Sequence, residues 1–148
     1  MCASATDTAA PLIIGLLREH RTVTVKLAGR SMVPRLQPGD EIIIAPVLCP
    51  ISISIGEIAV FTKGHVIVAH RVIWIPKRAA GTHALICRSD NGRIYEYVRS
   101  SSLLGHVTLV RRSGQVLSAD SWRGLRWALD AMVRLPLSLA IHTPRHCC

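Results

Sequence analysis

Short segments rich in β-branched residues follow one another along most of the chain, and turn signals rather than helical patterns separate them. Thr22–Leu27 alternates between polar and apolar residues, and Glu41–Ala45 and Glu57–Thr62 are short apolar runs. The remaining segments of this kind are His83–Ser89, Arg93–Val98, Leu103–Arg112, Gln115–Ser118 and His65–Ile75, which is one long strand or a bent pair. Strands at this spacing without helices between them pair antiparallel, so the chain predicts a mainly β fold with a rolled sheet or barrel.

Helical patterns occur only at the two ends of the chain. In Pro11–His20 a proline suits the first turn and charged residues gather at the last, which predicts a short helix. In Ser121–Leu135 apolar residues recur at helical spacing with basic residues between them, which predicts an amphipathic helix. We therefore expect a tail and short helix over residues 1–20, a β-rich core over 21–118, and a helix and tail over 119–148.

The chain carries a strong positive charge. Its 148 residues include 18 Lys and Arg against 9 Asp and Glu, which gives a formal net charge of +9. Such a surface suits an anionic partner, such as a phosphate backbone, a lipid surface or an acidic peptide. The sequence has no zinc-finger or basic-zipper pattern and no interleaving of aromatic and basic residues. We therefore predict no specific nucleic-acid partner.

The cysteines form neither a disulfide framework nor a metal-ligand pattern. There are 5 of them at irregular spacing, which fits a reducing compartment. The tail gathers further metal-binding side chains at His142, His146, Cys147 and Cys148. Their spacing matches no zinc-site pattern, and a frayed tail is the simpler interpretation. The sequence therefore predicts no metal and no cofactor.

No segment has the length of a membrane span or the flanks of a signal peptide. The longest early apolar run is Pro11–Leu17, far short of the ~20 residues that a spanning helix needs, and no cationic region precedes it. We therefore predict a cytoplasmic protein. Two interpretations of the basic helix over Ser121–Leu135 remain open. It packs across the sheet, or it lies on a membrane surface with Trp122 and Trp127 at the interface.

One serine stands in a loop whose backbone is unusually constrained. The stretch "GRSMVPRLQPGD" runs from Gly29 to Asp40, with Ser31 between glycine and proline positions. A serine hydroxyl becomes a nucleophile only when a base takes its proton and donors stabilise the oxyanion. A loop of this kind leaves backbone N–H groups available for the second task. Taken alone, the stretch favours a surface turn, because Gly and Ser are common turn residues.

Further motifs follow this loop in a recognisable order. "GEIAVF", "AHRVI", "SDNGR" and "LLGHV" come after "GRSMVPRLQPGD", and the set covers residues 28–110. Together they resemble the conserved boxes of the signal peptidase I family, and the self-cleaving domains of SOS-type repressors share that fold and part of the first box. The resemblance implies a rolled antiparallel sheet and a serine endopeptidase that cuts an extended peptide after small residues.

The resemblance assigns catalytic roles to particular residues. Ser31 matches the nucleophile, and His70 matches the general base, where most bacterial members have lysine. Ser–Lys and Ser–His pairs are both known solutions to serine activation, and histidine suits base work near neutral pH. Two acids are candidates for orienting His70: Asp90 matches the box aspartate, and Glu96 stands where the histidine branch has a second acid. Lys63 would be the base only if the alignment slipped.

The same resemblance implies a substrate site beside the serine. Gly29, Met32, Pro34 and Ile58 match or adjoin family positions at the pocket, which would be shallow and lined by Ile and Val. Gly29 lacks the hydroxyl that some members add to the oxyanion hole, so the backbone N–H of Ser31 would have to serve. The partner expected here is a peptide or precursor protein, such as the leader of a modified peptide.

Two other functions remain open from the sequence. One is an inactive member of the same fold that binds a peptide or protein without cutting it. The other is a repressor-like domain that cleaves itself, for which "CASA" and "TAAP" in residues 1–20 offer small residues. Both alternatives keep the same fold. In the first, Ser31 would not act as a nucleophile, and in the second it would cleave its own chain.

Overall fold

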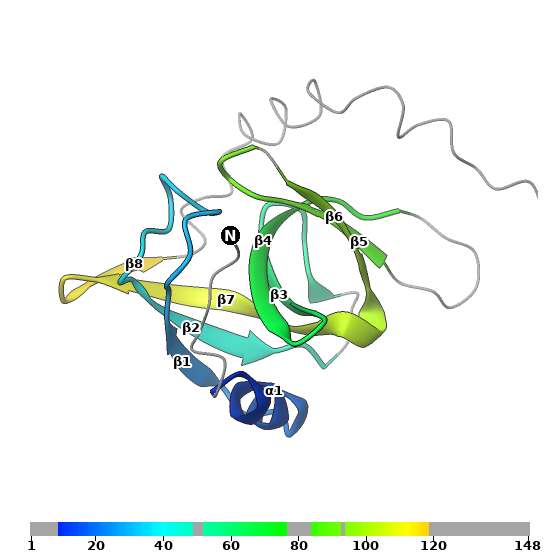
Figure 1. The fold of residues 1–148 in the computed structure, drawn as a ribbon, viewed down its shortest axis with the longest axis horizontal. Helices are drawn as coiled ribbons and strands as arrows, with labels where there is room; N and C mark the ends of the chain where they lie inside the picture. Colours follow the sequence, from blue (N-terminus) through cyan, green and yellow to red (C-terminus); the bar gives the residue numbers. More distant parts are fainter. Residues whose placement is uncertain (1–8, 49–51, 77–83, 93, 119–148) are drawn as a thin grey trace, which may run out of the picture.

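The computed structural model describes residues 9–48, 52–76, 84–92 and 94–118, and they form one antiparallel sheet with a short helix against it (Figure 1). The elements in chain order are α1 (Ala10–Arg18), β1 (Val23–Lys26), β2 (Glu41–Pro46), β3 (Ile58–Lys63), β4 (Val66–Trp74), β5 (Ala84–Arg88), β6 (Tyr95–Arg99), the 3-10 turn η2 (Ser100–Ser102), β7 (Leu103–Arg112) and β8 (Gln115–Ser118). The prediction of a mainly β fold with antiparallel pairing is confirmed. The helix expected over Ser121–Leu135 lies outside the described residues.

The sheet has eight strands in the order β1-β2-β7-β3-β4-β5-β6, with β8 paired to β7. Strand β7 joins the two halves of the sheet, because it pairs with β2 on one side and with β3 and then β8 on the other. Figure 1 shows β3 to β6 curling into a roll, while β1, β2, β7 and β8 form a flatter part that α1 lies against. The segment expected as one strand or a bent pair is a single strand, β4.

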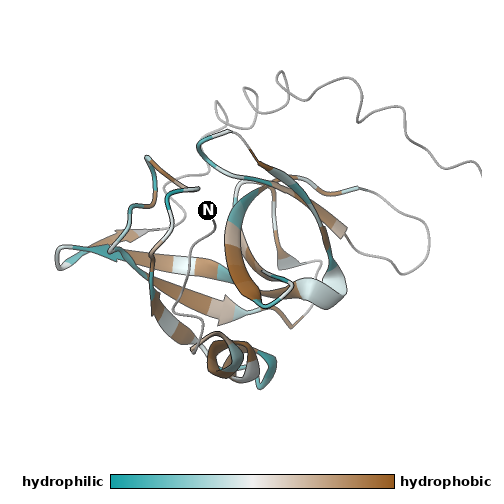
Figure 2. Cartoon of the chain, in the orientation of Figure 1, coloured by the Kyte–Doolittle hydropathy of each residue, from teal (hydrophilic) through white to brown (hydrophobic). Residues whose placement is uncertain are grey.

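Two apolar cores correspond to these two halves. The larger core collects residues from α1, β1, β2, β7 and one face of the β3–β4 pair, among them Leu17, Ile42 and Val110. The second core fills the roll and includes Phe61 and Val72. Because β4 lies between both cores, its middle residues are buried on both faces, and the sequence there is an almost continuous apolar run. Figure 2 shows the apolar residues along these strands.

The helix α1 is held by packing rather than by capping. It contains no polar residue from Ala10 to Leu17, and Leu17 is buried where the helix meets β1, β2 and β7. Its N-cap is Ala9, which makes no side-chain hydrogen bond. The predicted short helix is confirmed, ending two residues earlier than expected. In the described ranges, no helix has both the length and the apolar character to cross a membrane.

Strand β4 is only partly covered by its neighbours. It pairs with β3 along the whole of Val66–Arg71, but with β5 only through Arg71–Trp74. The half that ends at His70 therefore has no strand partner on its second side within the described ranges. An open strand edge of this kind can accept another extended chain through backbone hydrogen bonds.

Candidate active site

The loop that carries Ser31 is fixed to the sheet by a partly buried ion pair. Asp40 ends the loop, and its carboxylate accepts hydrogen bonds from the Gln37 N–H (2.8 Å) and from Arg112 Nε (2.8 Å) and Nη2 (2.7 Å) on β7. Arg112 Nη2 also donates to the Arg35 carbonyl at 2.8 Å. These bonds to Arg112 hold the pKa of the Asp40 carboxyl below its usual value. The Gly-Asp end of the loop therefore anchors the serine-bearing segment.

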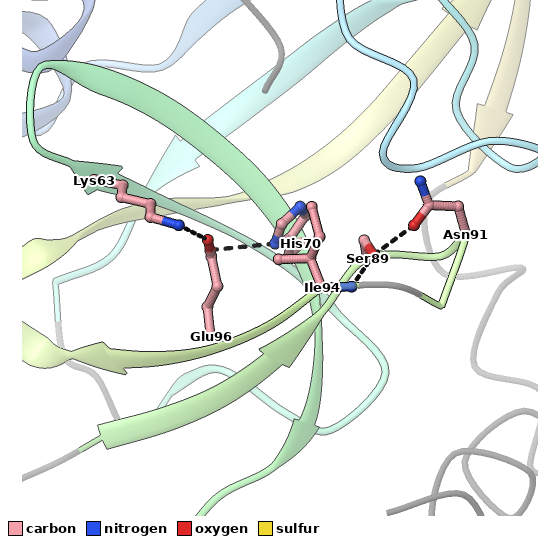
Figure 3. Close-up of polar contacts among 6 residues, drawn as sticks. All are labelled: Lys63, His70, Ser89, Asn91, Ile94 and Glu96. Carbon is pink, nitrogen blue, oxygen red and sulfur yellow. Dashed lines mark hydrogen bonds and ion pairs between the residues drawn. The ribbon is translucent and has the colours of Figure 1, made fainter. Parts of the chain in front are cut away.

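The other end of this loop touches the turn between β5 and β6. The Ser31 carbonyl accepts a hydrogen bond from the Asn91 N–H at 3.1 Å, and Ser31 is buried with 9 % of its surface exposed. Ser89 holds the turn together, because its hydroxyl donates to Asn91 Oδ1 (2.6 Å) and accepts from the Ile94 N–H (3.1 Å), as Figure 3 shows. Thus the stretches "GRSM" and "SDNG", far apart in the sequence, meet in the fold.

Asp90 lies in the same turn and is bound to the arginine that follows His70. Arg71 Nε donates to Asp90 Oδ1 at 2.8 Å and Arg71 Nη2 donates to Oδ2 at 2.6 Å. Arg71 Nη1 also donates to the Gly56 carbonyl at 2.7 Å, and both charged side chains are almost fully buried. Of the two candidate acids, Asp90 is therefore committed to Arg71 rather than in contact with the imidazole. It fastens the turn beneath Ser31 to β4.

Glu96 is the acid that faces His70. Its Oε2 lies 3.3 Å from His70 Nδ1, and the two side chains are 9 % and 1 % exposed. The contact is long for a hydrogen bond, and in the described part of the chain neither atom bonds to any other group. Phe61 closes the site on another side, with its ring edge to the imidazole at a centroid distance of 6.1 Å. Burial lowers the pKa of His70 from its ordinary value of 6.5, while the Glu96 carboxylate acts in the opposite direction.

Lys63, the alternative base, occupies a different position. Its Nζ donates to Glu96 Oε1 at 2.7 Å, and its side chain is 61 % exposed at the end of β3. Lys63 is therefore the ion-pair partner of Glu96 at the exposed end of the site. Of the two candidate bases, only His70 is both buried and held against an acid.

An apolar groove lies between the end strand β1 and the open edge of β4. It is lined by residues of both strands and of the sheet between them: Val25, Lys26, Leu27, Ala28, Ile42, Ile44, Val60, Ile67 and Ala69. Met32 and Ile58 are buried in the core cluster to which several of these residues belong, and they do not line the groove itself. Gly29 is partly exposed and Pro34 is exposed, and neither lines the groove.

The remaining histidines and the metal ligands add no competing site. His65 is exposed in the turn before β4, and His106 lies on β7 with its Nδ1 buried. In the parts of the chain that the structure describes, no group of His, Cys, Asp and Glu side chains is arranged to hold a metal ion. His83 and the tail from His142 to Cys148 lie outside these parts.

The sequence did not assign roles to Lys63, Arg71 or Asn91 in this arrangement. Arg71 belongs to the same motif as His70, so the sequence drew attention to it. Its pairing with Asp90 is determined by the fold and could not be inferred from the motif. Lys63 was considered as a base, and nothing in the local pattern relates it to Glu96. Comparison of the chain with protein-family models, with curated proteins and with solved structures finds no match.

Proposed function

We propose that the protein is a serine endopeptidase of the signal peptidase I type, in which Ser31 is the nucleophile, His70 the general base and Glu96 the orienting acid. The observation that carries the proposal is the buried contact between His70 Nδ1 and Glu96 Oε2 at 3.3 Å. A histidine whose one nitrogen faces a carboxylate has its other nitrogen available to take a proton. Burial lowers the pKa of His70, so the base is neutral at pH 7.

The hydrogen-bonded connections around Ser31 support the same assignment. Asn91 binds the Ser31 backbone, and its neighbour Asp90 clamps Arg71, which adjoins His70 on β4. The loop of the nucleophile and the strand of the base are thereby fastened to one turn. Such fastening gives the rigidity that positioned catalytic groups require.

The proposed reaction is acyl transfer in two steps. The Ser31 Oγ attacks the scissile carbonyl carbon while His70 Nε2 takes the hydroxyl proton, and the backbone N–H of Ser31 donates to the oxyanion. The C–N bond then breaks as His70 returns the proton to the leaving amine. Water, deprotonated by His70, attacks the ester, and hydrolysis releases the acid product and restores the Ser31 hydroxyl.

The groove between β1 and β4 is small, about 20 Å³ in volume, so an extended peptide substrate would lie along the strand edge and place at most a small side chain in the groove. A peptide strand laid there would pair with the open edge of β4 that leads to His70. Ala28 and Ala69 line the groove among larger apolar residues, which leaves room for small side chains of the substrate. The exposed cation Lys26 at its margin favours acidic or neutral residues over basic ones.

Cleavage of a defined peptide mixture tests the proposal. The full chain is incubated with peptides whose sequences carry paired small residues, and the products are read by mass spectrometry. We expect Ser31→Ala and His70→Asn each to lower the cleavage rate at least about 10³-fold. Ser101→Ala, which changes an exposed serine on η2, is the matched control and should cut like wild type. Equal rates for Ser31→Ala and wild type would exclude this function, and binding without cutting would favour a peptide-binding protein.

A further inference from the structure

The two oxygens of Glu96 contact two different residues. Oε2 faces His70 Nδ1 at 3.3 Å, and Oε1 accepts a hydrogen bond from Lys63 Nζ at 2.7 Å. Figure 3 shows the three side chains in one row, with the Glu96 carboxylate between the ammonium and the imidazole. The three residues come from β3, β6 and β4, so the row exists only in the folded roll.

Burial increases along this row. The Lys63 side chain is 61 % exposed, Glu96 is 9 % exposed and His70 is 1 % exposed. Lys63 and Glu96 line one polar cleft with Tyr95 and Tyr97, so the carboxylate lies between solvent and the buried imidazole. The row therefore connects an exposed charge to the interior of the roll.

A carboxylate buried to this degree needs a compensating partner. Taking a charge out of water is costly unless hydrogen bonds or an opposite charge replace the solvent. The residue opposite Glu96 on β5 is Cys87, and burial raises the pKa of its thiol to about 12, so it carries no charge. The described neighbour that supplies Glu96 with both a positive charge and a hydrogen bond is Lys63.

We infer that Lys63 is a positioning residue, which holds the Glu96 carboxylate in the orientation that places Oε2 against His70 Nδ1. Its ammonium binds Oε1, and because a carboxylate is rigid and planar, fixing Oε1 also fixes Oε2. A role of Lys63 in catalysis rests on the proposed function. Its effect on the pKa of His70 does not, because that effect depends only on the folded chain.

The charges around His70 define what removal of Lys63 will do. Glu96 from β6 and Asp90 from the turn after β5 raise the pKa of His70, and Lys63 from β3 lowers it. His106 of β7 lies in the same row of the sheet, across Ala59. Arg71 is next along β4 on the opposite face, where Asp90 binds it. Loss of the Lys63 charge alone would therefore raise the pKa of His70, whereas a Glu96 carboxylate that leaves its position would lower it, and the contributions of Glu96 exceed that of Lys63.

The experiment is an NMR titration of the His70 imidazole in the full chain, with the resonance assigned by its absence in His70→Asn. We expect Lys63→Met and Glu96→Gln each to shift the midpoint downward, because both variants lose the Glu96 carboxylate that is oriented against His70 Nδ1. Lys63→Arg keeps the charge and can still bind Oε1, so its midpoint should stay near that of wild type. If Lys63→Met leaves the midpoint unchanged, or moves it upward as loss of its charge alone would, the inference is wrong.

A matched control separates this effect from a general loss of charge. Arg99 is an exposed cation on β6, and it points to the opposite face from Glu96 because it lies three residues on. Arg99→Met removes the same formal charge and should leave the His70 midpoint in place. An equal shift in both variants would contradict a specific role for Lys63. Lys63→Gln provides a second neutral variant, should the Met variant fold poorly.

Activity gives an independent measurement once a cleaved peptide is known. Lys63→Met should lower kcat about threefold to tenfold and leave KM unchanged, because the residue acts through Glu96 and does not touch the substrate. Lys63→Arg should recover most of the loss. If no peptide is cut, the proposed function fails while the titration still decides the inference. If peptides are cut and the titration shows no response to Lys63, the inference fails alone.

Discussion

His70 and Arg71 are neighbours on β4 and equally buried at 1 % exposure. They point to opposite faces of the strand and differ in how completely their polar atoms are hydrogen bonded. Arg71 donates from Nε and Nη2 to Asp90 and from Nη1 to the Gly56 carbonyl. His70 has one long contact, to Glu96, and its pKa is lowered by burial. A fully bonded buried group stabilises the fold, whereas an incompletely bonded one retains capacity for proton transfer.

This difference explains why the two acids of the region are not interchangeable. Asp90 accepts hydrogen bonds from a permanent cation at both of its oxygens, and these bonds hold it toward Arg71 rather than His70. Glu96 reaches into the roll from β6, which lies beyond β5 in the sheet, and faces the imidazole. We therefore expect changes on the Arg71 face to lower stability and changes on the His70 face to lower activity.

Removing Arg71 is the strongest test of that comparison. Arg71→Met leaves Asp90 as an uncompensated charge whose side chain is 1 % exposed, which costs about 3–5 kcal/mol of unfolding free energy. Urea unfolding measures the loss. The double variant Arg71→Met with Asp90→Leu should recover much of it, because both buried charges are then absent. A single variant as stable as wild type would show that this face does not hold the fold.

Removing the charge of Glu96 should give the reverse result. Glu96→Gln keeps the shape of the side chain but loses the carboxylate that orients His70, so kcat should fall about 10²-fold to 10⁴-fold. Its unfolding free energy should change by no more than about 1–2 kcal/mol, since the lost pair includes an exposed lysine. Peptide cleavage and urea unfolding on the same samples measure both. If Glu96→Gln lost much stability and kept full activity, the His70 face would serve the fold rather than catalysis, which contradicts the comparison.

The pair of Asp40 and Arg112 provides an intermediate case at the nucleophile loop. Arg112 is 32 % exposed, so solvent screens the pair, and Arg112→Met should cost about 1–2 kcal/mol at pH 7. Because the folded pKa of Asp40 is lowered from 3.8, its contribution is present above that pH and is lost as the pH falls through the folded pKa. The difference in unfolding free energy between wild type and Arg112→Met, measured by urea unfolding, should therefore narrow as the pH falls below 3.8. If this difference does not change with pH, the charge of Asp40 does not contribute to the stabilisation by Arg112.

The smallest expected effect is the dependence of stability on His70 protonation. Its folded pKa is lowered from 6.5, so the unfolded chain binds the proton more readily and stability declines as the pH falls below 6.5. Above pH 6.5, His70 does not make the unfolding free energy depend on pH. The acid limb of kcat/KM should likewise lie below pH 6.5 rather than above it. His70→Asn should remove its share of the decline in stability, and an unchanged pH profile in that variant would contradict the assignment.

The strand pattern could be predicted from the sequence because local alternation and turn residues determine it. The apolar runs predicted β2, β3 and β4, and turn residues separate the strands, as at Gly92 between β5 and β6, which has a φ of 76°. Periodicity identifies which side chains share a face of one strand, and it does not identify the partner strand. The open edge of β4 beside His70 therefore could not be foreseen.

The same limit applies to the candidate site. Asp90 and Glu96 were both candidates from the sequence, because each matches an acidic position in the family that the motifs resemble. The choice between them depends on β5 pairing with β6 and β4, which brings Glu96 to the interior of the roll and Asp90 to Arg71. Lys63 joins the row only because β3 and β6 border the same cleft.

The most direct test of the account is the protonation state of the His70 ring, which needs no substrate. Nitrogen-15 NMR at neutral pH distinguishes the two neutral tautomers from the imidazolium. We predict a neutral ring with the proton on Nδ1, facing Glu96, and a lone pair on Nε2 to accept the Ser31 proton. A proton on Nε2, or a charged ring at pH 7, would contradict the assignment of His70 as the general base.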